Sequence, residues 1–321
     1  MREQARARLD ALAKPPGSLG RLETLAVQLC EIAGACPPPF PSPVRVFVFA
    51  GDHGVLAQGV SPWPQSVTAA MVRTFAMGGA AVNALARQVG AEVTVVDVGV
   101  AAPVRGALDR NVRRATADLS VGPAMSADEA SEAFEVGRSL AAESDAGLLV
   151  TGDMGIGNTT PSACIIAALT GRAAADVTGR GTGIDDATLE LKTAIVEAAV
   201  ARVRGADART VLAEVGGLEI AAIAGLIAGA RVPVVVDGVI ALAGLLVAAT
   251  LDPAVIHRVI AGHRSTEPGA AAALDHLGLD PLLDLGMRLG EGTGALLAVP
   301  IVQAAARIIT EMATLDDVLG S

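Results

Sequence analysis

The chain has 321 residues, of which 52% are hydrophobic and 18% charged, and its formal net charge is −10. This length and apolar content suffice to bury a large core. The negative charge argues against a nucleic-acid partner and against binding to an anionic membrane surface. It is compatible with a small anionic substrate, which needs only local positive charge.

Targeting and redox signals favour the cytoplasm. Cys30, Cys36 and Cys164 lack the spacing of a metal site, and their low, odd number is typical of a reducing compartment. The charged N-terminus leads into no apolar signal region, and charged residues interrupt the apolar stretch 216–251. The sequence therefore predicts a soluble, cytoplasmic protein without a membrane span.

The predicted elements begin with two helices, Arg2–Ala13 and Leu19–Ala33, followed by a proline-rich boundary at 37–43. Short apolar runs rich in β-branched residues then alternate with alanine-rich helical segments. These runs are Val44–Ala50, Val93–Val98, Gly147–Thr151, Val232–Val236 and Val255–Ala261. They lack polar alternation, as parallel strands covered on both faces do. The pattern predicts an α/β fold with a doubly wound, mostly parallel, Rossmann-like sheet.

The chain ends with a predicted apolar helix from about Ala295 to Met312. We expect it to pack with the two N-terminal helices. Residues 1–36 and about 295–321 are therefore predicted to form a small helical subdomain, and residues 44–294 a large α/β substrate-binding domain.

Several predicted strands end in a glycine beside a polar residue, as in Gly51-Asp52-His53, Gly152-Asp153, Asp237-Gly238 and Gly262-His263. Ligands of open parallel sheets bind at the carboxyl ends of the strands. The sequence thus predicts one large site for a small polar ligand. An Asp-His pair without a second cluster favours an orienting role over metal binding.

Two glycine-rich motifs are candidates for binding a phosphate. Gly155 and Gly157 lie between a predicted strand and a predicted helix, where backbone N–H groups can face an anion. The alternative is a helix-capping turn. Lys192, one of only two lysines, follows the motif 179–183 and could reach a phosphate. The alternative is a solvated lysine on a surface helix.

A single carboxylate, Glu291, lies in the glycine-rich turn 285–295 ahead of the apolar C-terminal helix. Glycines on both sides let a ligand approach closely. A poorly solvated carboxylate has a raised pKa and suits a general base. The alternative is an acid that favours the helix dipole. The lone Trp63 is either a packing residue or the wall of an aromatic-ligand pocket.

Ordered motifs over nearly the whole chain resemble the nicotinate-nucleotide–dimethylbenzimidazole phosphoribosyltransferase family of cobalamin lower-ligand synthesis. The motifs are Lys14-Pro15-Pro16-Gly17-Ser18-Leu19-Gly20, Phe49-Ala50-Gly51-Asp52-His53-Gly54-Val55, Met154-Gly155-Ile156-Gly157-Asn158-Thr159-Thr160, Gly179-Arg180-Gly181-Thr182-Gly183, Val235-Val236-Asp237-Gly238, Ala261-Gly262-His263-Arg264-Ser265 and the Glu291 turn. The resemblance implies transfer of phosphoribose from nicotinate mononucleotide to 5,6-dimethylbenzimidazole, with inversion at the anomeric carbon. The products are α-ribazole 5′-phosphate and nicotinate. It also implies a homodimer and no metal or other cofactor.

The resemblance also implies roles for individual residues. Glu291 matches the family's general base. Gly155, Gly157 and Lys192 match its phosphate site, while Asp153, Gly238 and Ser265 match its nicotinate and ribose site. Ser61 and Trp63 fall in the stretch that lines the benzimidazole pocket.

Two departures from the family pattern leave other functions open. Asp153 replaces the usual glutamate, and Ala69 and Ala70 lie where some members have glutamine. One alternative is the same chemistry with another acceptor, such as a purine or a different benzimidazole. A second alternative is a non-catalytic nucleotide-binding sensor.

Overall fold

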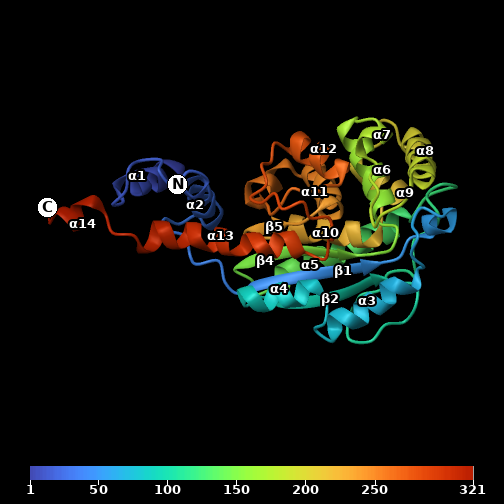
Figure 1. The fold of residues 1–321 in the computed structure, drawn as a ribbon, viewed down its shortest axis with the longest axis horizontal. Helices are drawn as coiled ribbons and strands as arrows, with labels where there is room; N and C mark the ends of the chain where they lie inside the picture. Colours follow the sequence, from blue (N-terminus) through green and yellow to red (C-terminus); the bar gives the residue numbers. More distant parts are fainter. Residues whose placement is uncertain (321) are drawn as a thin grey trace.

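The computed structural model describes residues 1–320, and within them six parallel strands form one sheet in the order β3-β2-β1-β4-β5-β6 (Figure 1). The strands are β1 Val44–Gly51, β2 Glu92–Gly99, β3 Leu108–Asp109, β4 Leu148–Met154, β5 Val234–Val236 and β6 Val259–Ala261. The chain builds outward from β1 to β3 and then from β4 to β6, so the topology reverses between β1 and β4. This is the doubly wound fold that the sequence predicts.

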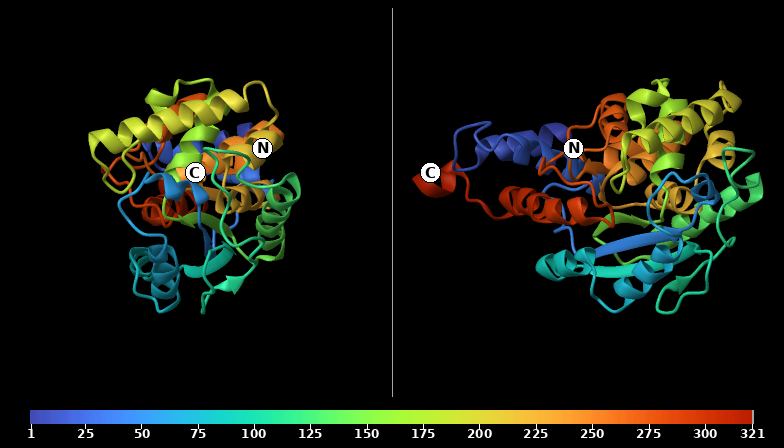
Figure 2. Two further views of the ribbon diagram at one scale, coloured as in Figure 1. Left: turned by 90° about the vertical axis from the view of Figure 1, so that its right-hand side faces the viewer. Right: turned by 45° about the vertical axis from the view of Figure 1, so that its right-hand side comes forward.

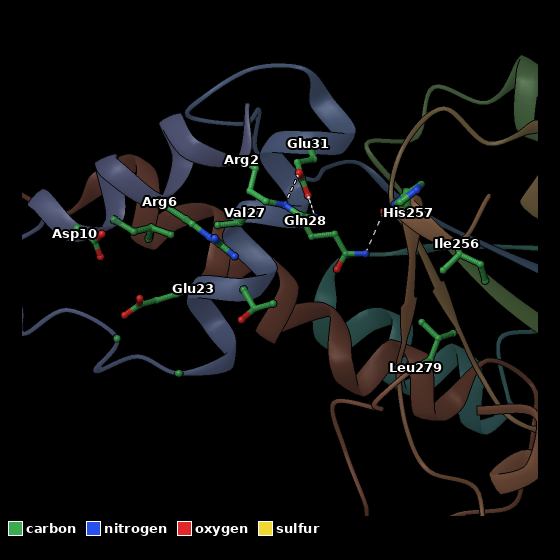
Figure 3. A pocket seen from close by; sticks show the side chains of 14 residues that line it. Arg2, Arg6, Asp10, Glu23, Val27, Gln28, Glu31, Ile256, His257 and Leu279 are labelled. Carbon is green, nitrogen blue, oxygen red and sulfur yellow. Dashed lines mark hydrogen bonds and ion pairs between the residues drawn. The ribbon is translucent and has the colours of Figure 1, made fainter. Parts of the chain in front are cut away.

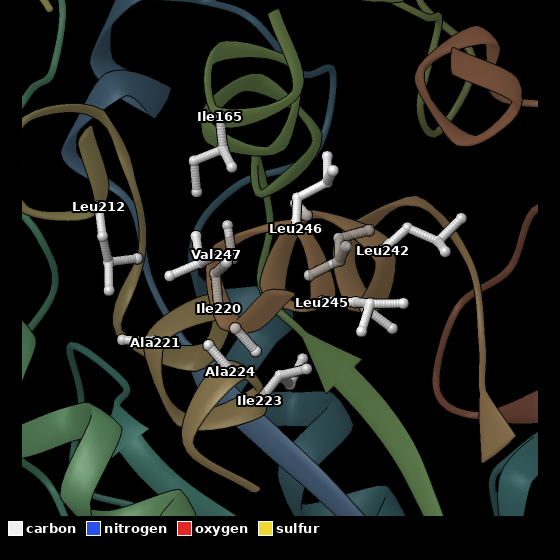
Figure 4. Close-up of a cluster of buried hydrophobic side chains, with 14 of the residues drawn as sticks. Ile165, Leu212, Ile220, Ala221, Ile223, Ala224, Leu242, Leu245, Leu246 and Val247 are labelled. Atoms are coloured by element: carbon white, nitrogen blue, oxygen red, sulfur yellow. The ribbon is translucent and has the colours of Figure 1, made fainter. Parts of the chain in front are cut away.

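Alternate residues of the strands face two apolar layers. Phe47 and Phe49 of β1 belong to one cluster, and Val46 and Val48 to the other. The first cluster is covered by α5 Ala127–Glu143, α6 Thr159–Thr170, α7 Ala174–Val177, α8 Asp186–Arg202, α9 Ala208–Val215, α10 Leu218–Gly229, α11 Val239–Leu251 and α12 Pro268–Leu277. Figure 4 shows the part of this core where α11 packs against both α6 and α10. Burial on both faces explains why the strands read as unbroken apolar runs.

The other face is covered by helices from the two ends of the chain and from between β1 and β2. They are α1 Arg2–Ala11, α2 Arg21–Ala33, α3 Ser66–Ala76, α4 Ala81–Val89 and α13 Thr293–Glu311. A short α14, Leu315–Leu319, follows α13, and the 3₁₀ helices are η1 Gly54–Gln58 and η2 Pro253–Arg258.

The first and last segments of the chain lie side by side at the end of the molecule away from the strand tips (Figures 1 and 2). A bridge pairs Leu12 with Thr314, and α1 and α2 both pack on α13. The apolar cluster runs without a break from α1 and α2 through α13 onto the sheet. The division into a small helical subdomain and a large domain therefore stays a prediction.

The structure differs from the predicted strands at several places: β4 extends to Met154, and β5 begins only at Val234. The predicted strand Val255–Ala261 begins only at Val259, because Pro253–Arg258 forms η2. Asp252 caps this helix by accepting a hydrogen bond from the Ala254 N–H, and proline occupies its first turn. The sequence also gives no sign of β3, since two residues form no apolar run.

Two helical segments, 66–89 and 293–311, are long and apolar enough to cross a membrane by length and composition. The first is interrupted between α3 and α4, and the second is the core helix α13. Neither therefore indicates a membrane span.

Candidate active site

The topological switch between β1 and β4 brings two predicted motifs together. An ideal Cβ on Gly155 would lie 2.3 Å from the carbonyl oxygen of Gly51, so the segments that leave the two strands touch through their backbones. The Ile156 N–H donates to Thr68 Oγ1 at 3.1 Å, which joins the first turn of α3 to the same loop. The candidate site thus lies where the fold family binds its ligands.

Glu291 is held in a left-handed turn at this edge. Its φ is 64°, and Gly290 and Gly292 on either side have φ of 82° and 90°. A left-handed conformation is costly for a residue with a side chain, so neighbouring contacts must hold it. The turn lies against β4: an ideal Cβ on Gly152 would be 2.6 Å from the Glu291 carbonyl oxygen. Glycine in the strand therefore makes room for the turn.

The Glu291 side chain is buried, with 6% of its surface exposed. Its Oε2 accepts a hydrogen bond of 3.3 Å from the Val82 N–H at the first turn of α4. Burial raises the pKa of Glu291, the Val82 hydrogen bond opposes the rise, and the nearby Asp237 carboxylate adds to it. The poorly solvated position that the sequence predicts is confirmed. A proton acceptor with a raised pKa is what this arrangement offers chemically.

We expect Gly152→Ala to lower the free energy of unfolding by about 1–3 kcal/mol, because the new methyl group overpacks the contact with Glu291. Urea denaturation followed by circular dichroism would measure the change. Gly122→Ala is the matched control, since a Cβ there meets no atom within 4 Å. Equal stability of the two variants would contradict the close contact between β4 and the turn.

Asp153, at the end of β4, has one bonded and one free oxygen. Oδ2 accepts a hydrogen bond of 3.0 Å from Asn158 Nδ2, whereas Oδ1 is buried without a hydrogen-bond partner in the range 1–320. Burial, together with the carboxylates of Asp237 and Glu219, raises the pKa of Asp153 well above its usual range. A buried oxygen without a partner is costly. Asp153 Oδ1 can therefore bond to a ligand hydroxyl or carry a proton.

Lys192 connects the two glycine-rich motifs. Its side chain is 1% exposed, and Nζ donates to Thr159 Oγ1 at 2.7 Å and to the Gly179 carbonyl oxygen at 2.9 Å. The alternative of a solvated surface lysine is therefore wrong. The Thr159 hydroxyl oxygen is therefore occupied by Lys192. Within the described chain, no side chain caps the N-terminus of α6. Burial lowers the pKa of Lys192 to about 8, so its charge lacks full compensation.

Gly238 and Ser265, two further predicted site residues, lie next to each other. An ideal Cβ on Gly238 would lie 3.8 Å from Ser265 Cβ. Glu267, two residues further, accepts a hydrogen bond of 2.9 Å from the Gly181 N–H and so ties this segment to the Lys192 motif. Beside them lies a cavity of about 380 Å³. It is lined by Thr178, Gly179, Arg180, Gly183, Leu189, Thr266, Glu267, Pro268 and Arg288.

Ser61 and Trp63 lie on the loop after η1. Val60, next to Ser61, is 4.0 Å from an ideal Cβ on Gly157, and Ser61 Oγ accepts a hydrogen bond of 3.3 Å from the Trp63 N–H. Trp63 is 51% exposed and lies outside the two apolar clusters of the core. Both residues lie near the loop of Gly155 and Gly157. Their role in binding stays a prediction.

The structure contains one buried pair of ionisable side chains that the sequence does not predict. His53 Nε2 lies 3.0 Å from Glu219 Oε1, and neither side chain is exposed. Asp52 instead accepts a hydrogen bond of 2.9 Å from the Ala101 N–H. The available signal was Glu219 itself, a carboxylate in an otherwise apolar helix. In the stretch 1–320, no group of three or more His, Cys, Asp or Glu side chains is arranged to hold a metal ion.

A larger cavity, of about 640 Å³, lies elsewhere, between the N-terminal helices and η2 (Figure 3). Arg2 pairs with Glu31 at its wall, and Gln28 bonds to the backbone of His257. This cavity contains none of the predicted site residues. It lies toward the amino end of β6, and the candidate site lies at the carboxyl ends.

The chain is similar to known phosphoribosyltransferases over its whole length. A family model described as "Phosphoribosyltransferase" matches residues 1–318. A Salinispora tropica protein named nicotinate-nucleotide–dimethylbenzimidazole phosphoribosyltransferase is 56% identical, with 95% of this chain and 91% of that protein covered. A Chloroflexus aggregans protein of the same name is 54% identical, with 97% and 91% covered.

Solved structures agree with these matches. The crystal structure of CobT from Thermus thermophilus has a TM-score of 0.96 and 46% identity, with 99% of this chain and 98% of that chain covered. A second structure from the same organism, titled as the dimethylbenzimidazole phosphoribosyltransferase, has a TM-score of 0.94 and 45% identity, with 100% and 98% covered. The chain therefore belongs to the family of nicotinate-nucleotide–dimethylbenzimidazole phosphoribosyltransferases.

Proposed function

We propose that this protein transfers phosphoribose from nicotinate mononucleotide to 5,6-dimethylbenzimidazole, giving α-ribazole 5′-phosphate and nicotinate. The observation that carries the proposal is the buried Glu291 turn at the topological switch of a chain that belongs to this family. A binding protein has no need for a dry carboxylate with a raised pKa at this place. The sensor alternative is therefore less well supported.

In the proposed reaction, Glu291 is the general base. It removes the proton from one benzimidazole nitrogen while the other nitrogen attacks the anomeric carbon of the ribose. The bond from that carbon to the pyridinium nitrogen breaks, and nicotinate leaves with the electron pair. Because the leaving group starts as a cationic pyridinium, its departure needs no metal or other cofactor. Inversion requires the two bases to lie on opposite faces of the ribose.

The phosphate of the mononucleotide is proposed to bind at Gly155, Gly157 and Lys192. The buried ammonium, which bonds only to a hydroxyl and a carbonyl oxygen, supports this assignment. A phosphate dianion beside Lys192 would supply the missing negative charge. Backbone N–H groups of the loop before α6 add further donors.

The remaining assignments follow from the positions of the side chains. Asp153, with its free oxygen, is proposed to bind the ribose, and Gly238 and Ser265 the nicotinate side of the mononucleotide. Ser61 and the half-exposed Trp63 are proposed to line the benzimidazole pocket. An aromatic wall suits a flat aromatic acceptor.

We expect the KM for nicotinate mononucleotide to rise above about pH 8, where Lys192 of the free enzyme loses its proton. Loss of one required proton gives a rise of about tenfold per pH unit. Lys192→Met should have a high KM without this pH dependence, whereas Glu190→Gln, an exposed site on the same helix, should behave like wild type. A wild-type KM that stays constant from pH 7 to 10 would contradict the assignment of Lys192.

The proposed function is tested with purified protein, nicotinate mononucleotide and dimethylbenzimidazole, with nicotinate and α-ribazole phosphate separated by chromatography. Both products should form in equal amounts, and neither without the acceptor. Binding of the mononucleotide by calorimetry without turnover would instead support the sensor.

The identity of the acceptor base is the half of the proposed reaction that the site specifies less closely, and a competition assay determines which base the protein prefers. Ala69 is buried in the core, whereas Ala70 is partly exposed on the same helix. An alanine in place of glutamine removes a polar contact to the acceptor, which is the reason to compare dimethylbenzimidazole with other flat bases such as adenine. Equal concentrations of dimethylbenzimidazole and adenine in one assay would give the preference directly.

A homodimer and a cytoplasmic location complete the proposal. Leu285 and Leu289, on the loop before Glu291, are 61% and 57% exposed. Exposed apolar side chains close to a site support an interface with a second subunit. Light scattering of the purified protein would give the mass of the assembly.

A further inference from the structure

The turn that carries Glu291 leads directly into helix α13, and the N-cap residue of this helix provides no capping side chain. Gly292 is the N-cap of α13, and a glycine has no side chain that could accept a hydrogen bond from the N–H groups at the start of the helix. Helix α13 is buried at this end, so water cannot replace the cap. Another part of the chain must therefore accept these hydrogen bonds.

Asp237, at the end of β5, provides both acceptors. Its Oδ2 accepts a hydrogen bond of 3.1 Å from the Gly292 N–H, and its Oδ1 accepts one of 2.9 Å from the Ala295 N–H. A carboxylate at a helix N-terminus also interacts favourably with the helix dipole. One side chain thus fixes both the residue directly after Glu291 and the first turn of α13.

Asp237 is itself held in place from two sides. Its N–H donates to Thr151 Oγ1 on β4 at 3.2 Å, and His263 Nε2 lies 3.4 Å from its Oδ1. The side chain is fully buried, so it cannot serve as a solvent-facing cap. These contacts make Asp237 a fixed point of the sheet to which the turn is attached.

We propose that Asp237 is the positioning residue of Glu291: by binding the Gly292 and Ala295 N–H groups it holds the left-handed turn that aims the carboxylate into the site. This inference rests on the proposed function for its consequence in catalysis. Its structural part, the anchoring of residues 290–296, can be measured without any substrate.

The charge of Asp237 has a second effect on the same residue. The polar groups that face Glu291 are the Val82 N–H from α4, Asp153 from β4 and Asp237 from β5. Of these, the Asp237 carboxylate adds to the rise in the pKa of Glu291 that burial causes. Position and basicity of the base thus depend on one aspartate.

The experiment compares Asp237→Asn with Asp97→Asn. Asparagine keeps the size of the side chain but has one acceptor oxygen and no charge. Asp97 is a matched control, because it too is buried and accepts from two backbone N–H groups, those of Gly99 and Val100, at 3.1 and 2.8 Å. It lies at the end of β2, away from the Glu291 turn.

Hydrogen-exchange mass spectrometry is the first readout. Asp237→Asn should speed exchange in the segment 290–296 by at least about tenfold, the equivalent of one hydrogen bond to a charged acceptor. Asp97→Asn should leave that segment unchanged and affect residues 97–101. Unchanged exchange at 290–296 in Asp237→Asn would overturn the proposal, whether or not the protein turns over the proposed substrates.

Kinetics give the second readout. Asp237→Asn should lower kcat at least about tenfold and move the acid limb of kcat/KM to lower pH. In a Glu291→Gln background the same substitution should change kcat less than about twofold, because its effect passes through Glu291. Additive losses with an unmoved acid limb would reduce Asp237 to a purely structural role and overturn the proposal. If the wild type is inactive but Asp237→Asn still exchanges faster than wild type at 290–296, only the proposed function is refuted.

Discussion

Glu291→Gln should lower kcat by about a hundred- to ten-thousand-fold, the usual contribution of a general base. Glutamine keeps the length of the side chain and can still accept from the Val82 N–H, but it cannot take the benzimidazole proton. Steady-state assays at saturating concentrations of both substrates measure the loss. Glu132→Gln, at an exposed site on α5, is the control.

The pH profile adds an independent test of the same residue. Since burial raises the pKa of Glu291, the base is protonated in acid solution up to a pH above the ordinary glutamate range. We therefore expect kcat/KM to fall on the acid side at a pH above 4.5, and this limb to be missing in Glu291→Gln. A fully active Glu291→Gln would refute the role of Glu291 and leave Asp153 as the candidate base.

Glu219→Leu should lower the free energy of unfolding by about 3–5 kcal/mol, because it removes one partner of a fully buried pair. Burial opposes the charge of His53, but the carboxylates of Glu219 and Asp52 outweigh it and raise the pKa of His53. Denaturant unfolding of wild type and variant over a range of pH measures the difference. Glu190→Leu, on the surface, should change stability by less than about 0.5 kcal/mol.

The sign of the pH dependence follows from the raised pKa. The stability that the charged pair contributes is fully present below the unfolded value of about 6.5. It is lost as the pH rises through the higher folded value, so the gap between wild type and Glu219→Leu should shrink in that direction. The double variant His53→Phe/Glu219→Leu should recover part of the loss, because no polar group is left alone. A gap that is the same at every pH would mean that packing alone accounts for the loss.

The sequence predicts the main features of the fold because a sheet that is covered on both faces requires strands with continuous apolar runs. Strands β1, β2 and β4 read as apolar runs bounded by glycine, and β1 and β2 are found within one residue of their predicted ends. The run Val255–Ala261 shows the limit of this signal. Apolar residues mark burial, and only the local cap of Asp252 and Pro253 decides that part of the run becomes a 3₁₀ helix.

Local sequence marks Glu291 and Lys192 as candidates and the structure buries both side chains, but their roles come from the family resemblance and stay predictions. Partnerships between distant segments were not predictable. The Asp237 carboxylate binds backbone groups 55 and 58 residues further along the chain, and Glu219 meets a histidine far before it in the sequence. Such pairings depend on the strand order, which a single sequence does not specify. A lone acid in an apolar helix signals only that some partner exists.

The side-by-side packing of the two chain ends has a consequence for how the protein is made. Helices α1 and α2 leave the ribosome before α13, against which they pack and which follows about 260 residues later. Until then their apolar faces have no permanent cover, and closing so long a loop is slow. The Glu291 turn adjoins this same late helix. Docking of α1 and α2 onto α13 is therefore expected to be a late step of folding, after the segment that carries Glu291 has been synthesised.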